Sequence, residues 1–196
     1  AAVEYCGRDI VMTIRKHISD KGASVGEADG FDMKPDEALL GRLKTLRDEI
    51  SRKIHTPRNR IISDLTLVKM SELKPVTRFQ LMEKLHIGNS KCLVYGKIFI
   101  GEIRRHTGDY SQPDGFEGAP EADEGLFVRL AELRHTFALK ENKTDLTVMN
   151  DYTLYDICVK RPQNDEDFRR IYGIGEFKSQ KYAGAFIAAV RDYSQK

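Results

Sequence analysis

An internal repeat constrains the fold of this 196-residue chain more than any other feature. Residues 40–106 align with residues 127–193 at an offset of 87 without a gap, and sixteen of the 67 aligned pairs are identical. The identities include the turn residues Pro75/Pro162 and Gly88/Gly175. Because self-similarity at a fixed offset marks repeated copies of one structural unit, the chain is predicted to contain two copies of a single module.

A shorter match precedes the two copies. Gly7–His17 reads GRDIVMTIRKH and resembles Gly96–His106, GKIFIGEIRRH, at an offset of 89. Residues 1–19 are therefore predicted to be the last helix of a truncated upstream repeat, with an amphipathic lead-in helix as the alternative. The chain begins with Ala1 rather than Met, so we expect it to be a piece of a longer protein.

The hydrophobic pattern predicts an all-α protein. In residues 36–53 the apolar side chains recur at helical spacing (Leu39, Leu40, Leu43, Leu46 and Ile50). Further short helices are expected to begin at the N-caps Asp64 and Thr77 in the first copy and at Asp151 and Asn164 in the second. A long helix is expected over 90–106, a loop over 56–60, and no strand in either copy. Each module is thus predicted to be a bundle of four or five helices.

Two segments outside the repeat are predicted to be linkers. Residues 20–35 and 107–122 are rich in Gly, Asp, Ser and Pro. Such compositions favour flexible or loosely packed chain. The expected organisation is a helix over 1–19, a linker over 20–35, a module over 36–106, a linker over 107–122 and a module over 123–196.

Several classes of protein are excluded by what the sequence lacks. No stretch approaches the roughly 18–20 apolar residues of a membrane span, so no membrane partner is expected. The three cysteines, Cys6, Cys92 and Cys158, form no CxxC pair, which argues against zinc and favours small core residues in a reducing compartment. There is no phosphate-binding GxxxxGK[ST] motif and no recognisable catalytic triad. The chain is predicted to have no catalytic centre and no cofactor.

An ordered set of short motifs occurs in both copies. In the first copy it runs Leu46-Arg47, Asp64-Leu-Thr-Leu67, Lys74-Pro75, Ile87-Gly88 to Lys91, and Tyr95-Gly96 to Ile103. In the second it runs Leu133-Arg134, Asn150-Asp151-Tyr-Thr-Leu154, Arg161-Pro162, Ile171-Tyr-Gly-Ile-Gly175, Lys178 and Tyr182. This set resembles the HRDC domain, which is found at the C-termini of RecQ-type helicases and of ribonuclease D.

The resemblance implies two tandem five-helix auxiliary modules that bind nucleic acid, most like the C-terminal region of a bacterial RecQ-type DNA helicase. The parent protein would then be an ATP-dependent DNA helicase acting in repair and recombination in the cytoplasm, at the nucleoid. Two departures stand out. His86 replaces the first glycine of the usual Gly-apolar-Gly turn, and neither Asn59 nor Leu146 is the aromatic residue that some family members carry there.

The net charge of +2 conceals an asymmetry between the modules. Residues 36–106 hold 15 bases and 8 acids, a net of +7, whereas residues 123–196 hold 12 of each. The linker 107–122 holds four acids and no base. Because affinity for nucleic acid rests largely on phosphate neutralisation, the first module is the better candidate for binding single-stranded, forked or junction DNA.

Candidate contacts follow from this charge and from the Gly-containing turn, where the start of a helix favours an anion. In the first module the predicted nucleic-acid-binding residues are Arg52, Lys53, Arg58, Asn59, Arg60, Lys74, Arg78, Gly88, Asn89 and Lys91. Weaker candidates in the second module are Lys140, Lys143, Gly173, Gly175 and Lys178. The bland interpretation is a solvated basic face in the first module and, in the second, glycines that only permit a tight turn.

Two other functions stay open at this point. The array could be a protein-interaction or regulatory module, whose acidic linker and neutral copy dock on the helicase core of the same chain or on another repair protein. It could also be the RNA-binding tail of a ribonuclease D-like enzyme. The acidic run Asp165-Glu-Asp167 and Glu176 predict weaker phosphate binding by the second module.

Overall fold

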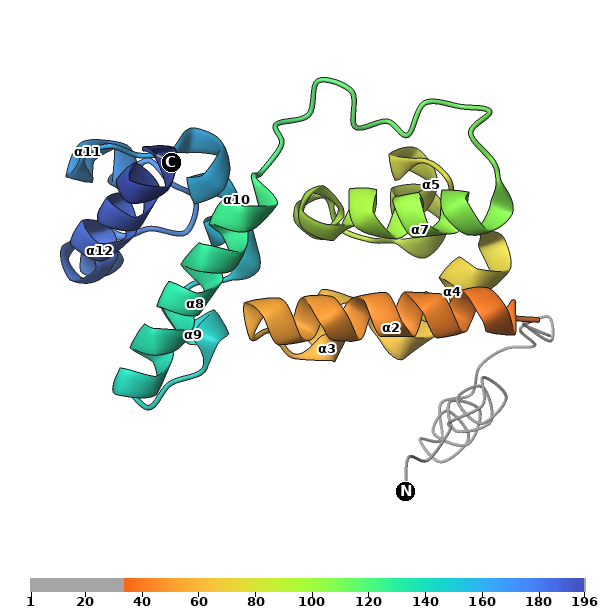
Figure 1. The fold of residues 1–196 in the computed structure, drawn as a ribbon, viewed down its shortest axis with the longest axis horizontal. Helices are drawn as coiled ribbons and strands as arrows, with labels where there is room; N and C mark the ends of the chain where they lie inside the picture. Colours follow the sequence, from red (N-terminus) through yellow and green to blue (C-terminus); the bar gives the residue numbers. More distant parts are fainter. Residues whose placement is uncertain (1–33, 196) are drawn as a thin grey trace, which may run out of the picture.

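The computed structural model describes residues 34–195 and shows two helical modules side by side (Figure 1). The helix predicted over 1–19 and nearly all of the linker predicted over 20–35 lie outside the described residues. No strand occurs between residues 34 and 195. The prediction of an all-α fold with two tandem bundles is confirmed.

The first module begins with its longest α-helix, α2 (Glu37–Ile54), followed by α3 (Arg58–Ile61), α4 (Asp64–Leu73) and α5 (Arg78–Leu85). It closes with one continuous helical rod made of α6 (Asn89–Lys91), a π-helical turn η1 (Cys92–Gly96) and α7 (Lys97–Thr107). The segment 56–60, predicted as a loop, contains the start of α3. That prediction was wrong because Pro57 supplies a fixed φ just before a short helix, where a missing N–H costs nothing.

The second module repeats this order with α8 (Glu124–Lys140), α9 (Asp145–Val148), α10 (Asp151–Lys160), α11 (Asp165–Arg169) and α12 (Glu176–Ser194). The helix α12 corresponds to the rod of the first module and has no π-helical turn. None of the helices described between residues 34 and 195 has the length and apolar character needed to span a membrane.

Two N-caps lie one residue before their predicted positions. Ser63 caps α4 by accepting from the backbone N–H of Thr66, and Asn150 caps α10 by accepting from that of Thr153. Asp64 and Asp151 are instead the first helical residues. The predictions for Thr77 and Asn164 are confirmed.

The displaced aspartates serve a second purpose that the repeat preserves. In the first module Arg47 donates through Nη1 to Ile62 O and to Asp64 Oδ1, at 3.0 and 2.7 Å. In the second module Arg134 donates through Nη1 to Met149 O and to Asp151 Oδ1, at 3.0 and 2.8 Å. The same arginine–carboxylate bond thus ties the first long helix to the α4 or α10 segment in both copies.

The modules contact each other through a buried polar network. Arg134 is fully buried and donates through Nη2 to Ile54 O and to Thr56 Oγ1 of the first module, at 2.7 and 3.1 Å. Asp151 in turn accepts from Thr56 Oγ1 and Tyr95 Oη, at 2.9 and 2.6 Å. Hydrogen bonds that are charge-assisted and shielded from water are among the stronger ones in proteins. The junction is therefore a specific interface.

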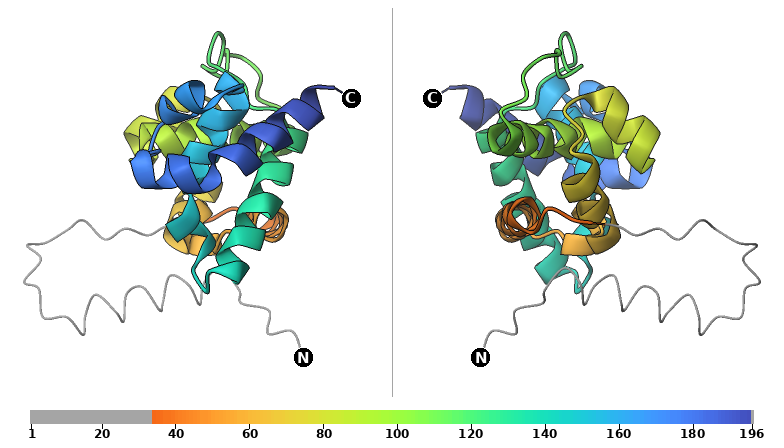
Figure 2. Two further views of the ribbon diagram at one scale, coloured as in Figure 1. Left: turned by 90° about the vertical axis from the view of Figure 1, so that its left-hand side faces the viewer. Right: turned by 90° about the vertical axis from the view of Figure 1, so that its right-hand side faces the viewer.

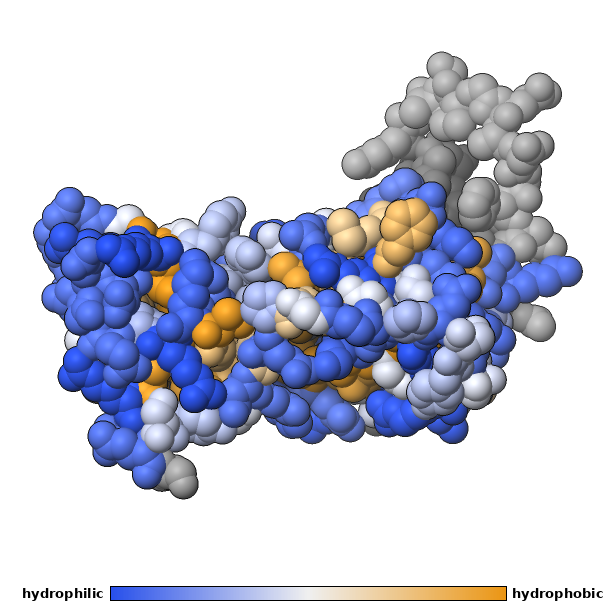
Figure 3. All heavy atoms as spheres, turned by 90° about the horizontal axis from the view of Figure 1, so that it is seen from above, coloured by the Kyte–Doolittle hydropathy of each residue, from blue (hydrophilic) through white to orange (hydrophobic). Residues whose placement is uncertain are grey.

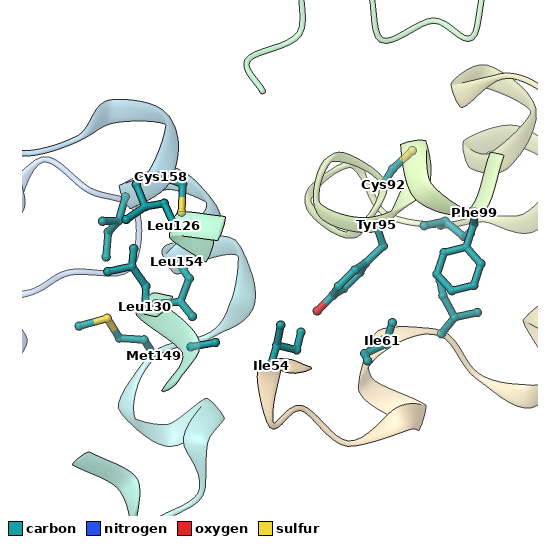
Figure 4. Close-up of a cluster of buried hydrophobic side chains, with 14 of the residues drawn as sticks. Ile54, Ile61, Cys92, Tyr95, Phe99, Leu126, Leu130, Met149, Leu154 and Cys158 are labelled. Carbon is teal, nitrogen blue, oxygen red and sulfur yellow. The ribbon is translucent and has the colours of Figure 1, made fainter. Parts of the chain in front are cut away.

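Apolar packing surrounds this network. The buried hydrophobic side chains of the two modules form one contiguous cluster. Figure 4 shows Ile54 and Tyr95 between the two sets of core side chains, with the Tyr95 hydroxyl directed away from its own module. The C-terminal end of α2 packs on α8 (Figure 2), and the His55 and His135 rings stack across this contact with centroids 3.9 Å apart.

The linker 107–122 packs on both modules, so the expectation that it is loose was wrong. The Phe116 side chain is buried, and a Cβ added to Gly96 would come within 3.0 Å of its ring. Pro120 O accepts a hydrogen bond from Tyr155 Oη of the second module. Since Gly96 leaves the space that Phe116 fills, the linker is held against the η1 turn.

Candidate nucleic-acid interface

A shallow hollow of about 410 Å³ lies where the helical rod of the first module begins. It brings together Asn59 of α3 and the predicted residues Gly88, Asn89 and Lys91. Its other lining residues are Ile62, Ser63, Thr66, Leu85, His86, Ile87 and Ser90. None of the lining residues is acidic, so the hollow presents no charge that would repel a phosphate.

The rod starts without a side-chain cap. Its N-cap is Gly88, which has no side chain, whereas the side chains of Asp36, Ser63 and Thr77 cap α2, α4 and α5. The first backbone N–H groups of a helix have no intrahelical acceptor. The residues of this helix start line the hollow, and an anion is the partner that the helix dipole favours there.

Glycine at position 88 is not required by the turn. Its φ of −61° is accessible to any residue, and a Cβ added there meets nothing within 4 Å. The preceding His86 takes the left-handed conformation, with φ of 52°, in place of the glycine expected in such a turn. The missing side chain at Gly88 therefore leaves open space beside the helix start.

Basic residues flank the hollow. Lys91 is half-buried. Burial and the nearby positive charge of Arg60 lower the pKa of Lys91, while the negative charge of Asp151 across the junction opposes this shift. Arg78 donates through Nη2 to Asn89 Oδ1 at 2.6 Å and stands over the Phe116 ring. Arg58 is exposed and pairs with Asp48 at 3.1 Å. A phosphate in the hollow would relieve the mutual repulsion of Lys91 and Arg60.

Six of the ten residues predicted in the first module do not line the hollow, and three of these six have their partners elsewhere. Lys74 pairs with Asp36 at 2.8 Å, at the start of α2, about 18 Å along the helix axis from Asp48. Lys53 pairs with Glu124 of the second module at 3.2 Å and lines a different cavity. Arg52 is exposed near the end of α2 and donates to Asp48 O of its own helix.

The corresponding turn of the second module has a different electrostatic character. Asp145, Asp165 and Glu176 occupy the positions of Arg58, Arg78 and Asn89. Gly175 again caps a helix without a side-chain bond, and Lys178 is half-buried, so desolvation lowers its pKa. The turn keeps its glycine N-cap and its lysine, but acids replace two arginines and an asparagine around it.

The remaining weak candidates are also constrained. Lys143 pairs with Glu141 at 2.9 Å, while Lys140 is exposed at the end of α8. Gly173 does need to be glycine, because its φ is +76° and an added Cβ would lie 2.8 Å from Thr153 Oγ1. For this residue the bland interpretation of a turn-forming glycine agrees with the structure.

Three tyrosines of the second module form a cluster that includes Tyr172 of the Gly173–Gly175 turn. The Tyr152 ring stacks on Tyr155 and meets Tyr172 edge-on, with centroids 5.8 and 5.1 Å apart. Tyr155 is buried, but Tyr172 is 60% exposed. Phe177, also largely exposed, follows the turn and lies under the Lys181 ammonium group.

Sequence reasoning missed several residues that line the hollow of the first module. Ser63, Thr66 and Ser90 contribute polar atoms there. Ser63 carried a recognisable signal, since a hydroxyl residue just before an apolar run is a good N-cap. Nothing in the sequence distinguishes Ser90 from an ordinary surface serine.

Comparisons with known proteins agree with the arrangement of the two modules. The model of the HRDC domain matches residues 36–103 and residues 123–190. The chain is 35% identical over 70 residues to an ATP-dependent DNA helicase RecQ of Bacillus subtilis, and 31% identical over 77 residues to the one of Haemophilus influenzae. These matches cover 36% and 39% of the chain but only 12% of each relative. No solved structure gave a significant match.

Proposed function

Because the chain belongs to the HRDC domain family, we propose that it is the auxiliary nucleic-acid-binding tail of a RecQ-type DNA helicase. The observation that carries this proposal is the hollow at Gly88–Lys91, which has no acidic lining residue and lies at a helix start without a side-chain cap. Phosphate contacts of this kind hold a strand without reading its sequence. The motor domain would lie elsewhere in the parent protein, in the bacterial cytoplasm at the nucleoid.

We propose single-stranded or structured DNA as the ligand. The similarity to two RecQ helicases favours DNA over the RNA of a ribonuclease D-like enzyme. Neither Asn59 nor its counterpart Leu146 can stack on a base, so binding would depend on backbone phosphates. By holding the strand beside the motor, the tail would modulate which DNA structures the helicase acts on.

The two modules would contribute unequally. The first module carries a net charge of +7 and the second is neutral. At the turn itself three positions change from Arg58, Arg78 and Asn89 to acids. We propose that the second module binds DNA weakly and instead orients the first module.

The test is a fluorescence anisotropy titration of the full chain with labelled single-stranded, forked and junction DNA. Lys91→Gln and Arg60→Gln should each weaken binding by about tenfold, and each should reduce the slope of log K against log salt by about 0.7 on single strands. Lys84→Gln removes the same charge from an exposed site of the same module that lies outside the hollow, and it should change affinity about twofold or less.

Three results would count against the proposal. These are salt-independent binding, an equal loss in Lys84→Gln and Lys91→Gln, and binding to RNA of the same sequence that is tighter than to DNA. The last result would favour the ribonuclease D-like alternative.

A further inference from the structure

A groove of about 700 Å³ runs along the seam between the two modules, on the side covered by the linker. It is bounded by the C-terminal half of α2, by η1 and the start of α7, by residues 114–122 of the linker and by the first turns of α8. In Figure 3, which views this side of the molecule, hydrophobic surface shows between hydrophilic side chains along the seam. The DNA-binding residues proposed above, apart from Lys53, do not line this groove.

The floor of the groove is apolar. Leu46 and Ile50 of α2, Val94 and Ile98 of the rod, and Phe127 of α8 line it. All but Ile98 are partly buried and pack against the core, whereas Ile98 is 41% exposed. Leaving apolar side chains facing water costs free energy that a bound apolar partner would recover.

The repeat shows that this apolar face is specific to the first module. Leu93, Val94 and Ile98 correspond to Gln180, Lys181 and Ala185 in α12 of the second module. The rod of the first module and α12 of the second have the same place in their bundles. Only the rod, which lines the groove, has large apolar side chains at these three positions. The difference indicates that the face is used for contact in the first module.

The rim of the groove is acidic. Glu49, Asp114, Glu117, Glu121 and Glu124 line it, together with only two lysines. Lys97 pairs with Glu121, and Lys53 pairs with Glu124. Within residues 34–195, Glu49, Asp114 and Glu117 make no ion pair. The rim therefore carries a net negative charge that repels DNA and complements a cationic partner.

We propose that this seam groove, defined by the floor and rim residues above, binds an amphipathic basic helix from a partner protein. Leu46 and Ile50 lie one turn apart on α2 and continue to the buried Ile54, which gives a ridge of about 12 Å. Apolar residues at i, i+4 and i+7 of a docked helix span about 10.5 Å and match this ridge. Lysine and arginine flanking those anchors would meet the three acids that make no ion pair.

The proposal is independent of DNA binding, since no residue lines both the hollow and the groove. The probe is a fluorescein-labelled synthetic peptide of about 14 residues with leucines at i, i+4 and i+7 and lysines on its polar face. A scrambled peptide of the same composition destroys the apolar stripe and is the peptide control. Binding is followed by fluorescence anisotropy with the full chain.

Two pairs of protein variants locate the site. Ile98→Asp places a charge on the floor, and Leu139→Asp makes the same change at a side chain that is 69% exposed elsewhere. Glu117→Lys reverses a charge of the rim, and Glu132→Lys reverses one on the exposed face of α8 outside the groove. Ile98→Asp and Glu117→Lys should each weaken peptide binding by about tenfold or more, and the two controls should change it about twofold or less.

The variants should leave the helical circular dichroism spectrum unchanged. DNA binding should also be unchanged, except that Glu117→Lys should bind DNA slightly more tightly. Equal binding of the scrambled peptide, no peptide binding, or equal losses in the groove variants and their controls would each overturn the proposal. The proposal would also be overturned if Ile98→Asp changed the self-association of the chain in analytical ultracentrifugation but did not change peptide binding. The groove would then bind a second copy of the chain.

Discussion

The hydrogen bond from Tyr95 to Asp151 allows the coupling between the two modules to be measured. Tyr95 is 4% exposed, and its hydroxyl donates to Asp151 Oδ2 at 2.6 Å across the junction. Burial and the Asp151 carboxylate raise the pKa of Tyr95, so the hydroxyl stays a donor throughout the accessible pH range. Tyr95→Phe removes only this hydroxyl and keeps the ring.

The expected cost of Tyr95→Phe follows from the environment of Asp151. A buried hydrogen bond to a charged group is worth about 1.5–3 kcal/mol. Asp151 Oδ1 keeps its bonds from Arg134 and Thr56, so the carboxylate is not left without partners. We therefore expect a loss of about 2 kcal/mol, or about 4–8 °C in Tm if the described residues unfold as one unit.

The assay is urea denaturation of the full chain, followed by circular dichroism, within a double-mutant cycle. Tyr95→Phe and Asp151→Asn together should show a coupling energy of about 1.5–2 kcal/mol. The repeat supplies the control, because Tyr182 aligns with Tyr95 but donates to Glu141 of its own module, at 3.0 and 3.1 Å. Tyr182→Phe and Asp151→Asn should be additive to within about 0.5 kcal/mol.

A coupling energy near zero between Tyr95→Phe and Asp151→Asn would refute the reasoning, since the two modules would then not be held together by this bond in solution. Equal coupling in the control cycle would refute it as well, because the effect would then be a general loss of stability rather than the junction itself.

Three further predictions test the turns, the charges and the linker. Gly173→Ala should lower the free energy of unfolding by about 1–3 kcal/mol in urea denaturation, because the φ of Gly173 is +76°. Gly88→Ala should lower it by about 1 kcal/mol or less, because Gly88 has a φ of −61° and open space around it, and should still weaken DNA binding in the anisotropy titration. Lys143 and Lys181 lower the pKa of Glu141 from 4.5 to about 2, so its contribution to stability is present above pH 4.5 and is lost as the pH falls toward 2. Glu141→Gln should flatten that part of a plot of the urea midpoint against pH, and an unchanged profile would contradict the assignment. Phe116→Ala should cost about 3–5 kcal/mol and should increase hydrogen exchange of the linker amides, and exchange rates equal to those of the native chain would show that the linker is not packed.

Much of the fold could be predicted from the sequence because the signals are local. Helical spacing of apolar residues located α2 and the rod of the first module, and the gapless repeat carried these assignments to α8 and α12. The caps at Asp64 and Asp151 were misplaced by one residue because Ser63 and Asn150 are equally good caps. Only the tertiary contact with Arg47 and Arg134 decides that the carboxylates belong to ion pairs.

The candidate site was predicted in part. The turn residues Gly88, Asn89 and Lys91 are adjacent in sequence, so their proximity needed no tertiary information, and Asn59 joins them in the hollow. Lys53 and Lys74 were predicted to belong to the same site only because they are basic. In the structure Lys74 pairs with Asp36 at the start of α2, and Lys53 pairs with Glu124 of the second module. A net charge says how many cations a module has and not which surface carries them.

The sequence by itself determined that there are two helical modules of one family and that one of them is basic. The tertiary structure decided how identical residues are used. Tyr95 and Tyr182 occupy the same place in the repeat, yet one bonds across the junction and the other within its module. The reason is physical: a repeat specifies which side chains each module presents, while the partner of each side chain depends on which surfaces meet, and that depends on packing between residues far apart in the chain.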